Sequence, residues 1–275
     1  VTRVKSLFDA AKAGHTGTLD PMATGLLPVT LGEATKFSHA MLEADKAYLA
    51  TVRLGVTTTT GDLEGEVLTR APVDADPHRV EAVLAQFRGE IVQTPPMYSA
   101  LKHAGRPLYE YARAGTEVAR APRQVTIRAL ELQHCGATDL RINVACSKGT
   151  YIRVLAEEIG KTLGCGATLA ELRRTHVGRF SLQEAVTLER LSAMTEVERV
   201  RHLLPADALL AGLPSLELDA EQAVRMARGQ AVNCTGMTNT GLVRVYGPGS
   251  AFLGVADADR EGRVVPRRLL SNAAA

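Results

Sequence analysis

Residues 14–25 read GHTGTLDPMATG and hold three glycines, one histidine and a single carboxylate, Asp20, which is followed at once by Pro21. A proline ring pushes the preceding residue out of the helical region into an extended conformation. We therefore expect Asp20 on a stiff, non-helical loop with its side chain held in a fixed direction. The flanking glycines can adopt positive φ and leave no Cβ in the path of a ligand. A carboxylate held in this way suits a nucleophile or a general base, and it equally suits the cap of a tight turn.

The longer stretch 14–37, GHTGTLDPMATGLLPVTLGEATKF, resembles the nucleophile motif of the bacterial tRNA pseudouridine-55 synthases, the TruB family. Later blocks of the sequence are similar to the same family in the same order, so the resemblance covers nearly the whole chain. It implies isomerisation of uridine to pseudouridine at position 55 in the T arm of tRNA. It also implies that Asp20 is the nucleophile and that the target base is flipped out of the RNA.

The composition is that of an ordinary globular protein. The chain has 275 residues, of which 45% are hydrophobic and 23% charged, so it can bury a large core in one or two domains. Aromatic residues make up only 4% and tryptophan is absent, which disfavours an aromatic platform for single-stranded nucleic acid. A net charge of +2 neither demands nor excludes an RNA partner, because a local patch of charge matters more than the sum.

The four cysteines form no CxxC pair and no zinc-ligand spacing, which predicts reduced thiols and a cytoplasmic location. None of the histidines forms a paired metal motif, so we expect no metal and no cofactor. We also expect no signal peptide and no membrane span. The sequence begins at Val1, whereas the family resemblance implies an earlier strand with a Lys-Pro pair. We therefore expect a missing edge strand and some loss of stability.

Hydrophobic periodicity predicts the regular elements. Helices are expected at residues 1–12, 33–42, 77–87, 107–114, 151–163 and 218–228. Strands are expected at residues 25–31, 46–55, 125–135, 140–146, 167–175, 241–246, 252–256 and 264–270. A polar loop is expected at 57–65. Strands outnumber helices and mostly follow one another through short turns, which favours an α+β fold with a mixed, largely antiparallel sheet and flanking helices. The resemblance implies the pseudouridine synthase fold.

Composition changes after the stretch PADALLAGLP at 205–214, which we interpret as a connector. The predicted domains are a catalytic domain at 1–204 and a small β-rich domain at 215–275 that resembles the RNA-binding PUA-like tail of the family. Within the first domain, residues 102–128 carry six Lys or Arg against two Glu. This basic excess and the resemblance to a mobile insertion predict RNA contact across 93–128, although such an excess is often a solvated face.

Two residues are candidates for the chemistry beside Asp20. A buried Asp20 needs a cationic neighbour, and the block CSKGTYIR at 146–153 resembles the family motif whose arginine ion-pairs with the catalytic aspartate. This assigns the role to Arg153, with a surface helix arginine as the alternative. Tyr48 is similar to the family's strand tyrosine, which stacks on the target base and has been considered a general base. A core tyrosine is the alternative.

The resemblance implies further contacts with the RNA or the target base. They are assigned to His15, Tyr151, Lys148, Asp62 and Leu172, of which Leu172 would close the base pocket. The alternatives are a histidine bonded to its own turn, a solvated turn aspartate and a core leucine.

Pseudouridine formation moves no electrons between molecules, so it requires an activated carboxylate, a sealed pocket and a group to remove a proton, but no redox cofactor. Attack at C6 of uracil and attack at C1′ of ribose both remain open. The alternative function is a non-catalytic module that binds or folds tRNA. A hydrolase is disfavoured, because no second carboxylate partner or Ser/His pairing is evident. We expect a monomer that binds the T stem-loop of tRNA.

Overall fold

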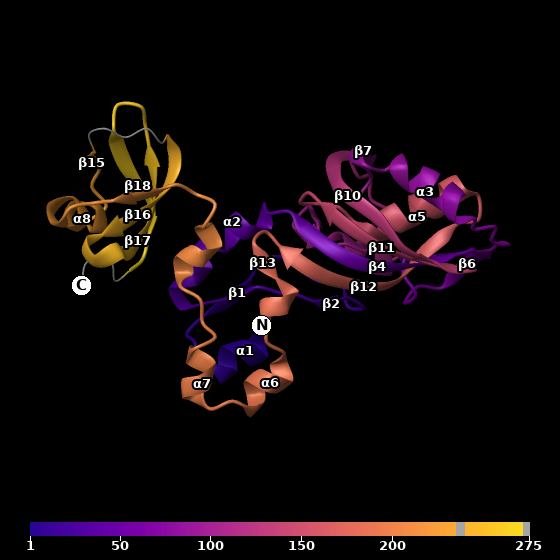
Figure 1. Ribbon diagram of the computed structural model, residues 1–275, viewed down its shortest axis with the longest axis horizontal. Helices are drawn as coiled ribbons and strands as arrows, with labels where there is room; N and C mark the ends of the chain where they lie inside the picture. Colours follow the sequence, from indigo (N-terminus) through magenta and orange to yellow (C-terminus); the bar gives the residue numbers. More distant parts are fainter. Residues whose placement is uncertain (235–239, 272–275) are drawn as a thin grey trace. The chain divides into compact units, whose positions relative to one another are not determined.

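The computed structural model of the chain describes residues 1–234 and 240–271 (Figure 1). The chain forms two compact units, each made of segments distant in sequence. Unit 1 comprises Val1–Thr16, Val29–Met41 and Val186–Ala275, and unit 2 comprises Gly17–Pro28 and Leu42–Ala185.

Unit 2 is built on a seven-stranded sheet with the strand order β13-β12-β4-β11-β10-β7, to which β2 is added beside β12. Its strands are β2 (Thr24–Gly25), β4 (Lys46–Leu54), β7 (Gly89–Gln93), β10 (Arg123–Cys135), β11 (Asp139–Cys146), β12 (Ala167–Val177) and β13 (Phe180–Ser181). The pairing of β2 with β12 is parallel, whereas the pairings along the rest of the sheet are antiparallel. The predicted α+β fold with a mixed, largely antiparallel sheet is confirmed.

Two helices, α3 (Pro77–Ala85) and α5 (Ile152–Leu163), cover one face of this sheet (Figure 1). Alternation along β4 turns Ala50, Val52 and Leu54 toward the helices, and all three are buried. The matching face of α5 repeats at helical spacing through residues Ile152, Leu155, Ala156, Ile159 and Leu163. This amphipathic pattern is why residues 151–163 could be predicted as a helix from sequence.

Shorter elements of unit 2 lie outside the large sheet. They are β5 (Val56–Thr58), β6 (Val67–Arg70), β8 (Lys102–His103), β9 (Arg106–Pro107) and α4 (Leu108–Arg113). The hairpin β5–β6 partly replaces the loop expected at 57–65, and neither β6 nor β7 was predicted. All four residues of β6 are exposed, so this strand has no apolar alternation for sequence analysis to detect.

Unit 1 contains the two ends of the chain. Its elements before β4 are α1 (Thr2–Leu7), β1 (Ala13–His15), β3 (Val29–Leu31) and η1 (Gly32–Phe37), followed by α2 (Ser38–Leu42) at the boundary of the two units. The helix expected at 1–12 is shorter than predicted. It ends at Leu7, because Asp9 takes a φ of 44° and residues 13–15 pair with β3.

The C-terminal part of unit 1 is the predicted small β-rich domain. A five-stranded sheet has the order β14-β16-β17-β18-β15. After β13, the short helix η2 (Leu182–Glu184) still belongs to unit 2. The elements of unit 1 that follow are α6 (Leu188–Ala193), α7 (Glu196–Val200), η3 (Ala206–Leu210), β14 (Ser215–Glu217), α8 (Ala220–Ala227), β15 (Val232–Asn233), β16 (Gly241–Gly247), η4 (Pro248–Ser250), β17 (Ala251–Ala258) and β18 (Arg263–Leu269). Met226 of α8 lies in the same core as Val243 and Val264 of the sheet.

The stretch expected as a connector, 205–214, contributes to a hydrophobic core. Leu210 of η3 is 4% exposed and packs in one cluster with Phe37 and Val255. The compact units therefore do not coincide with the predicted ranges 1–204 and 215–275. Within the described residues, the helices are too short or too polar to cross a membrane.

Candidate active site

Asp20 lies in irregular chain between β1 and β2, as the following proline predicts. The main-chain N–H of Ala23 donates to the carbonyl oxygen of Asp20 at 2.9 Å, which closes a turn immediately after the carboxylate. On both sides of Asp20, carbonyl oxygens of the loop accept hydrogen bonds from the side chain of Arg174.

Arg153, the second residue of α5, forms a bidentate ion pair with Asp20. Its Nε donates to Oδ2 at 2.9 Å and its Nη2 donates to Oδ1 at 3.1 Å. The Arg153 side chain is 5% exposed and the Asp20 side chain is 33% exposed, so part of the Asp20 side chain stays accessible. The remaining donors of Arg153 go to main-chain carbonyls, with Thr60 O at 3.1 Å and Tyr98 O at 2.8 Å. A guanidinium fixed at four points holds the carboxylate in a single direction.

Asp62 is a buried partner of the same guanidinium. Its Oδ2 lies 3.7 Å from Nε of Arg153, and its side chain is 6% exposed. The Thr60 hydroxyl and the N–H of Glu64 donate to its other oxygen, at 2.5 Å and 3.1 Å. A solvated turn aspartate, the alternative considered from sequence, does not describe this residue. Glu157, one turn after Arg153 in α5, has a pKa raised by burial, and Arg153 opposes that rise.

Tyr48 of β4 is also near this group. Burial raises the pKa of Tyr48 to about 12, while the guanidinium of Arg174 opposes the rise and Asp20 adds to it. Arg174 of β12 is 2% exposed, and sequence analysis did not single it out. The sequence contains one indication that the Arg174 side chain points inward. Leu172 and Arg174 are two residues apart on a strand, so if Leu172 points inward, Arg174 should do so too.

The other predicted residues fall into different surroundings. Tyr151 immediately precedes α5 in an extended conformation, and burial raises its pKa. Its main-chain N–H and carbonyl both bond to the side-chain amide of Gln93. Leu172 is 7% exposed and belongs to the main core of unit 2. Lys148 lies on the exposed loop before α5 and forms an ion pair with Glu43.

His15 belongs to the other compact unit. It is an exposed residue at the end of β1, where it pairs with Val29. The structure therefore brings Asp20, Arg153, Asp62 and Tyr48 together within unit 2, whereas His15 belongs to unit 1.

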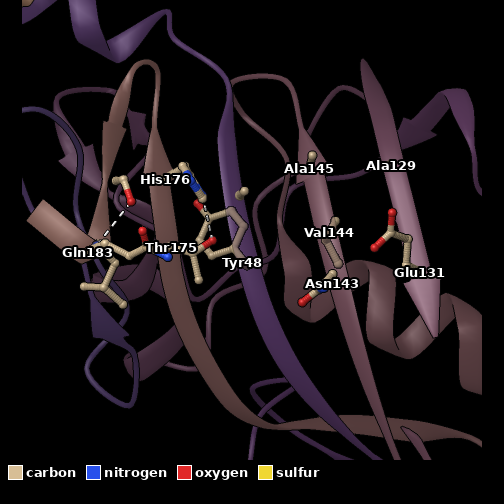
Figure 2. A pocket seen from close by; sticks show the side chains of 12 residues that line it. Tyr48, Ala129, Glu131, Asn143, Val144, Ala145, Thr175, His176 and Gln183 are labelled. Carbon is tan, nitrogen blue, oxygen red and sulfur yellow. Dashed lines mark hydrogen bonds between the residues drawn. The ribbon is translucent and has the colours of Figure 1, made fainter. Parts of the chain in front are cut away.

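A hollow of about 560 Å³ runs across β12, β4, β11 and β10 (Figure 2). Figure 2 shows Tyr48 beside Thr175 and His176 at one side of it and Glu131 and Asn143 at the other. Its lining includes Tyr48 but neither Asp20 nor Arg153. The ion pair therefore does not line this hollow, although Tyr48 belongs to both groups of residues. Among residues 1–234 and 240–271, no group of three or more His, Cys, Asp or Glu side chains could hold a metal ion.

Three family models match consecutive parts of the chain. Residues 5–152 match the N-terminal domain of the TruB family pseudouridylate synthases, and residues 153–211 match the tRNA pseudouridylate synthase B C-terminal domain. Residues 214–270 match the C-terminal model of pseudouridine synthase II TruB.

Relatives and solved structures agree with these matches. The tRNA pseudouridine synthase B of Methylobacillus flagellatus is 53% identical over 98% of this chain and 89% of its own length. That of Aromatoleum aromaticum is 56% identical over 98% of this chain and 87% of its own. The fold is similar to that in the crystal structure of a Cbf5-Nop10-Gar1 complex, with a TM-score of 0.73 and 25% identity over 98% of this chain and 79% of that one.

Together, the fold and the family matches define an enzyme of the pseudouridine synthase class. Within that class, the chain belongs to the TruB family.

Proposed function

We propose that this enzyme isomerises uridine to pseudouridine at position 55, in the T arm of tRNA, with Asp20 as the nucleophile. The observation that carries the proposal is the bidentate ion pair that holds a half-exposed Asp20 carboxylate against the buried Arg153. The choice of tRNA is supported by the relatives that are more than half identical, which are tRNA pseudouridine synthases B.

The reaction breaks the C1′–N1 glycosidic bond, turns the uracil and forms a bond between C1′ and C5. N1 gains a proton and C5 loses one, so substrate and product are isomers. A carboxylate is suited to the step because it can bond transiently to carbon and then leave again. Addition of Asp20 to C6 of uracil and to C1′ of ribose are both compatible with its geometry.

The neighbours of Asp20 have distinct roles in this proposal. Arg153 orients the carboxylate, and Asp62 limits how strongly the guanidinium neutralises it, because the two carboxylates share one cation. Tyr48, with a pKa of about 12, stays protonated at neutral pH. We infer that Tyr48 stacks on the uracil or donates a hydrogen bond to it.

The target uridine must leave the stacked T loop before the carboxylate in the protein can reach it. We propose that Tyr151 and Leu172 contact the extruded base, and that His15 and Lys148 contact the RNA around it. The insertion at 93–128 and the PUA-like domain at 215–275 would bind the rest of the T stem-loop. We further propose that the enzyme acts as a monomer in the cytoplasm, where its four free thiols would remain reduced.

The test of this function is an Asp20→Asn substitution, which keeps the size of the side chain but removes the nucleophilic oxygen. We expect release of tritium from C5-labelled uridine in a T-arm hairpin to fall by at least about 10⁴-fold. Binding of the hairpin should persist, because backbone contacts elsewhere supply most of the affinity. Asp74→Asn is the matched control, since the Asp74 side chain is 91% exposed. An Asp20→Asn enzyme as active as the control would refute the proposal.

A further inference from the structure

One buried guanidinium, that of Arg174, is directed at the loop that carries Asp20. Its Nε donates to the carbonyl oxygen of Leu26 at 2.8 Å. Its Nη1 and Nη2 donate to the carbonyl oxygens of Thr18 at 3.3 Å and Gly17 at 3.2 Å. The three acceptors lie on both sides of Asp20, so a single side chain joins the beginning and the end of the loop.

The main chain at the same position holds the loop as well. The N–H of Leu26 donates to the carbonyl oxygen of Arg174 at 2.8 Å, and β2 pairs with β12 at residues 24 and 25. Gly25 takes a φ of +101°, and a Cβ at that residue would lie 2.2 Å from the carbonyl oxygen of Arg174. The approach of the loop to β12 is therefore as close as a residue without a side chain permits.

Burial of the Arg174 guanidinium is unfavourable unless hydrogen bonds compensate for the lost water. A guanidinium that is 2% exposed has lost its hydration, which is unfavourable for an ion in a protein interior. Apolar residues of similar volume fill such positions at no such cost. The donors of Arg174 converge on three uncharged carbonyls of one loop, which a hydrophobic side chain could not bind.

We propose that Arg174 is a positioning residue that fixes the loop 17–26 so that the Asp20 carboxylate meets Arg153 and the reacting uridine in one orientation. The inference rests on the proposed role of Asp20. It assigns the two arginines different tasks, since Arg153 binds the carboxylate itself and Arg174 binds the main chain that carries it.

The position of Tyr48 agrees with this assignment. Tyr48 and Arg174 are paired residues on adjacent strands β4 and β12. Across this pairing, the Arg174 guanidinium opposes the rise that burial causes in the pKa of the Tyr48 hydroxyl. Arg174 thus binds the loop of the nucleophile and is paired, through its strand, with the tyrosine proposed to contact the base.

The experiment compares Arg174→Lys and Arg174→Met with the wild-type enzyme on a T-arm hairpin. Lysine keeps the charge but cannot reach three carbonyls, and methionine fills the space without any donor. We expect kcat to fall about 10²-fold in both variants, because a small misplacement of a reacting group has an effect of this size. The Kd for the hairpin should stay within about twofold of the wild-type value. A third variant, Arg174→Ala, should regain part of kcat when free guanidinium ion is added, and urea should not replace it.

A purely structural role would give a different pattern. Leu163→Ala, at the far end of α5, removes buried volume from the same core and serves as the destabilised control. If kcat falls equally in this control at matched fractions of folded enzyme, or if the Arg174 variants retain wild-type kcat, the positioning role is wrong. If the Arg174→Met variant does not fold, the Arg174→Lys variant and the rescue of Arg174→Ala by guanidinium still test the positioning role. Asp20→Asn separates the two proposals, because it tests the nucleophile without changing the loop.

Discussion

At the scale of single residues, the main feature of the site is that the Arg153 guanidinium donates four hydrogen bonds. Two of its hydrogen bonds reach Asp20, and two more reach carbonyl oxygens of segments far away in sequence. Satisfying the guanidinium in this way offsets much of the cost of burying it. It also means that the direction of the carboxylate depends on the segments at residues 60 and 98 as well as on its own loop.

Tyr48 leads to a prediction about alkaline stability. Its pKa is about 12 in the folded protein against 10.0 for a free tyrosine, so the folded state holds the proton more tightly. The corresponding stabilisation is fully present below pH 10 and is lost as the pH rises from 10 to 12. Between these pH values the wild type should therefore lose about 2 to 3 kcal/mol more than Tyr48→Phe. Urea unfolding at several pH values measures this, and parallel curves for the two proteins would contradict the burial of the hydroxyl.

At the scale of elements, short pieces of chain matter more to the site than the long ones. The two-residue strand β2 is a small part of the sheet, yet it anchors the loop of Asp20 to β12. The long helix α5 contributes a single residue, Arg153, from its first turn. The buried residues of α5 and β4 pack in one hydrophobic core, and this core supports the short segments that position the site.

Gly25 provides the prediction at this scale. A Gly25→Ala side chain would collide with the main chain of Arg174 in addition to being strained by the positive φ of +101°. We expect a loss of more than about 2 kcal/mol of unfolding free energy and a large loss of pseudouridine formation. The matched control is Gly164→Ala, which has a φ of +83° at the end of α5 but no atom within 4 Å of the added Cβ. The Gly164→Ala substitution should lower the free energy of unfolding by only about 1 kcal/mol and leave activity intact. If the two substitutions have equal effects on stability and activity, backbone strain alone accounts for the requirement for glycine at position 25.

At the scale of the whole molecule, a net charge of +2 leaves RNA binding to local groups of cations. In the basic stretch 102–128, three of the six cations are paired with carboxylates, namely Arg106, Arg120 and Arg128. The other three form no ion pair with any residue in the described parts of the chain. They are Lys102, Arg113 and Arg123, and all three are exposed.

These three cations predict the salt dependence of binding. Replacing Lys102, Arg113 and Arg123 together by glutamine should lower the slope of log Kd against log salt concentration by about 2 to 3. At saturating hairpin, kcat should change little. The charge-matched control replaces the exposed residues Arg53, Arg70 and Lys161 by glutamine. If both triple variants show the same slope, the insertion has no special part in binding RNA.

The sequence by itself determined the main elements of both β-rich regions and the irregular conformation at Asp20. Helical spacing in α5, alternation in β4 and the ring of Pro21 act over a few neighbouring residues, so they can be read along the chain. Strands β6 and β7 were not predicted, because most of their residues are exposed and they lack a clear alternation of apolar and polar residues.

Only the tertiary structure decided which charged groups meet. Asp20 and Arg153 are 133 residues apart, and sequence analysis paired them through a family resemblance, not through any local rule. Strand alternation placed Arg174 on the same face as Leu172, but nothing local showed that its guanidinium binds the loop of Asp20, or that Leu210 packs with Phe37 where a linker was expected. The physical reason is that hydrogen bonds and burial depend on distances across the folded chain, whereas periodicity depends only on neighbours along it.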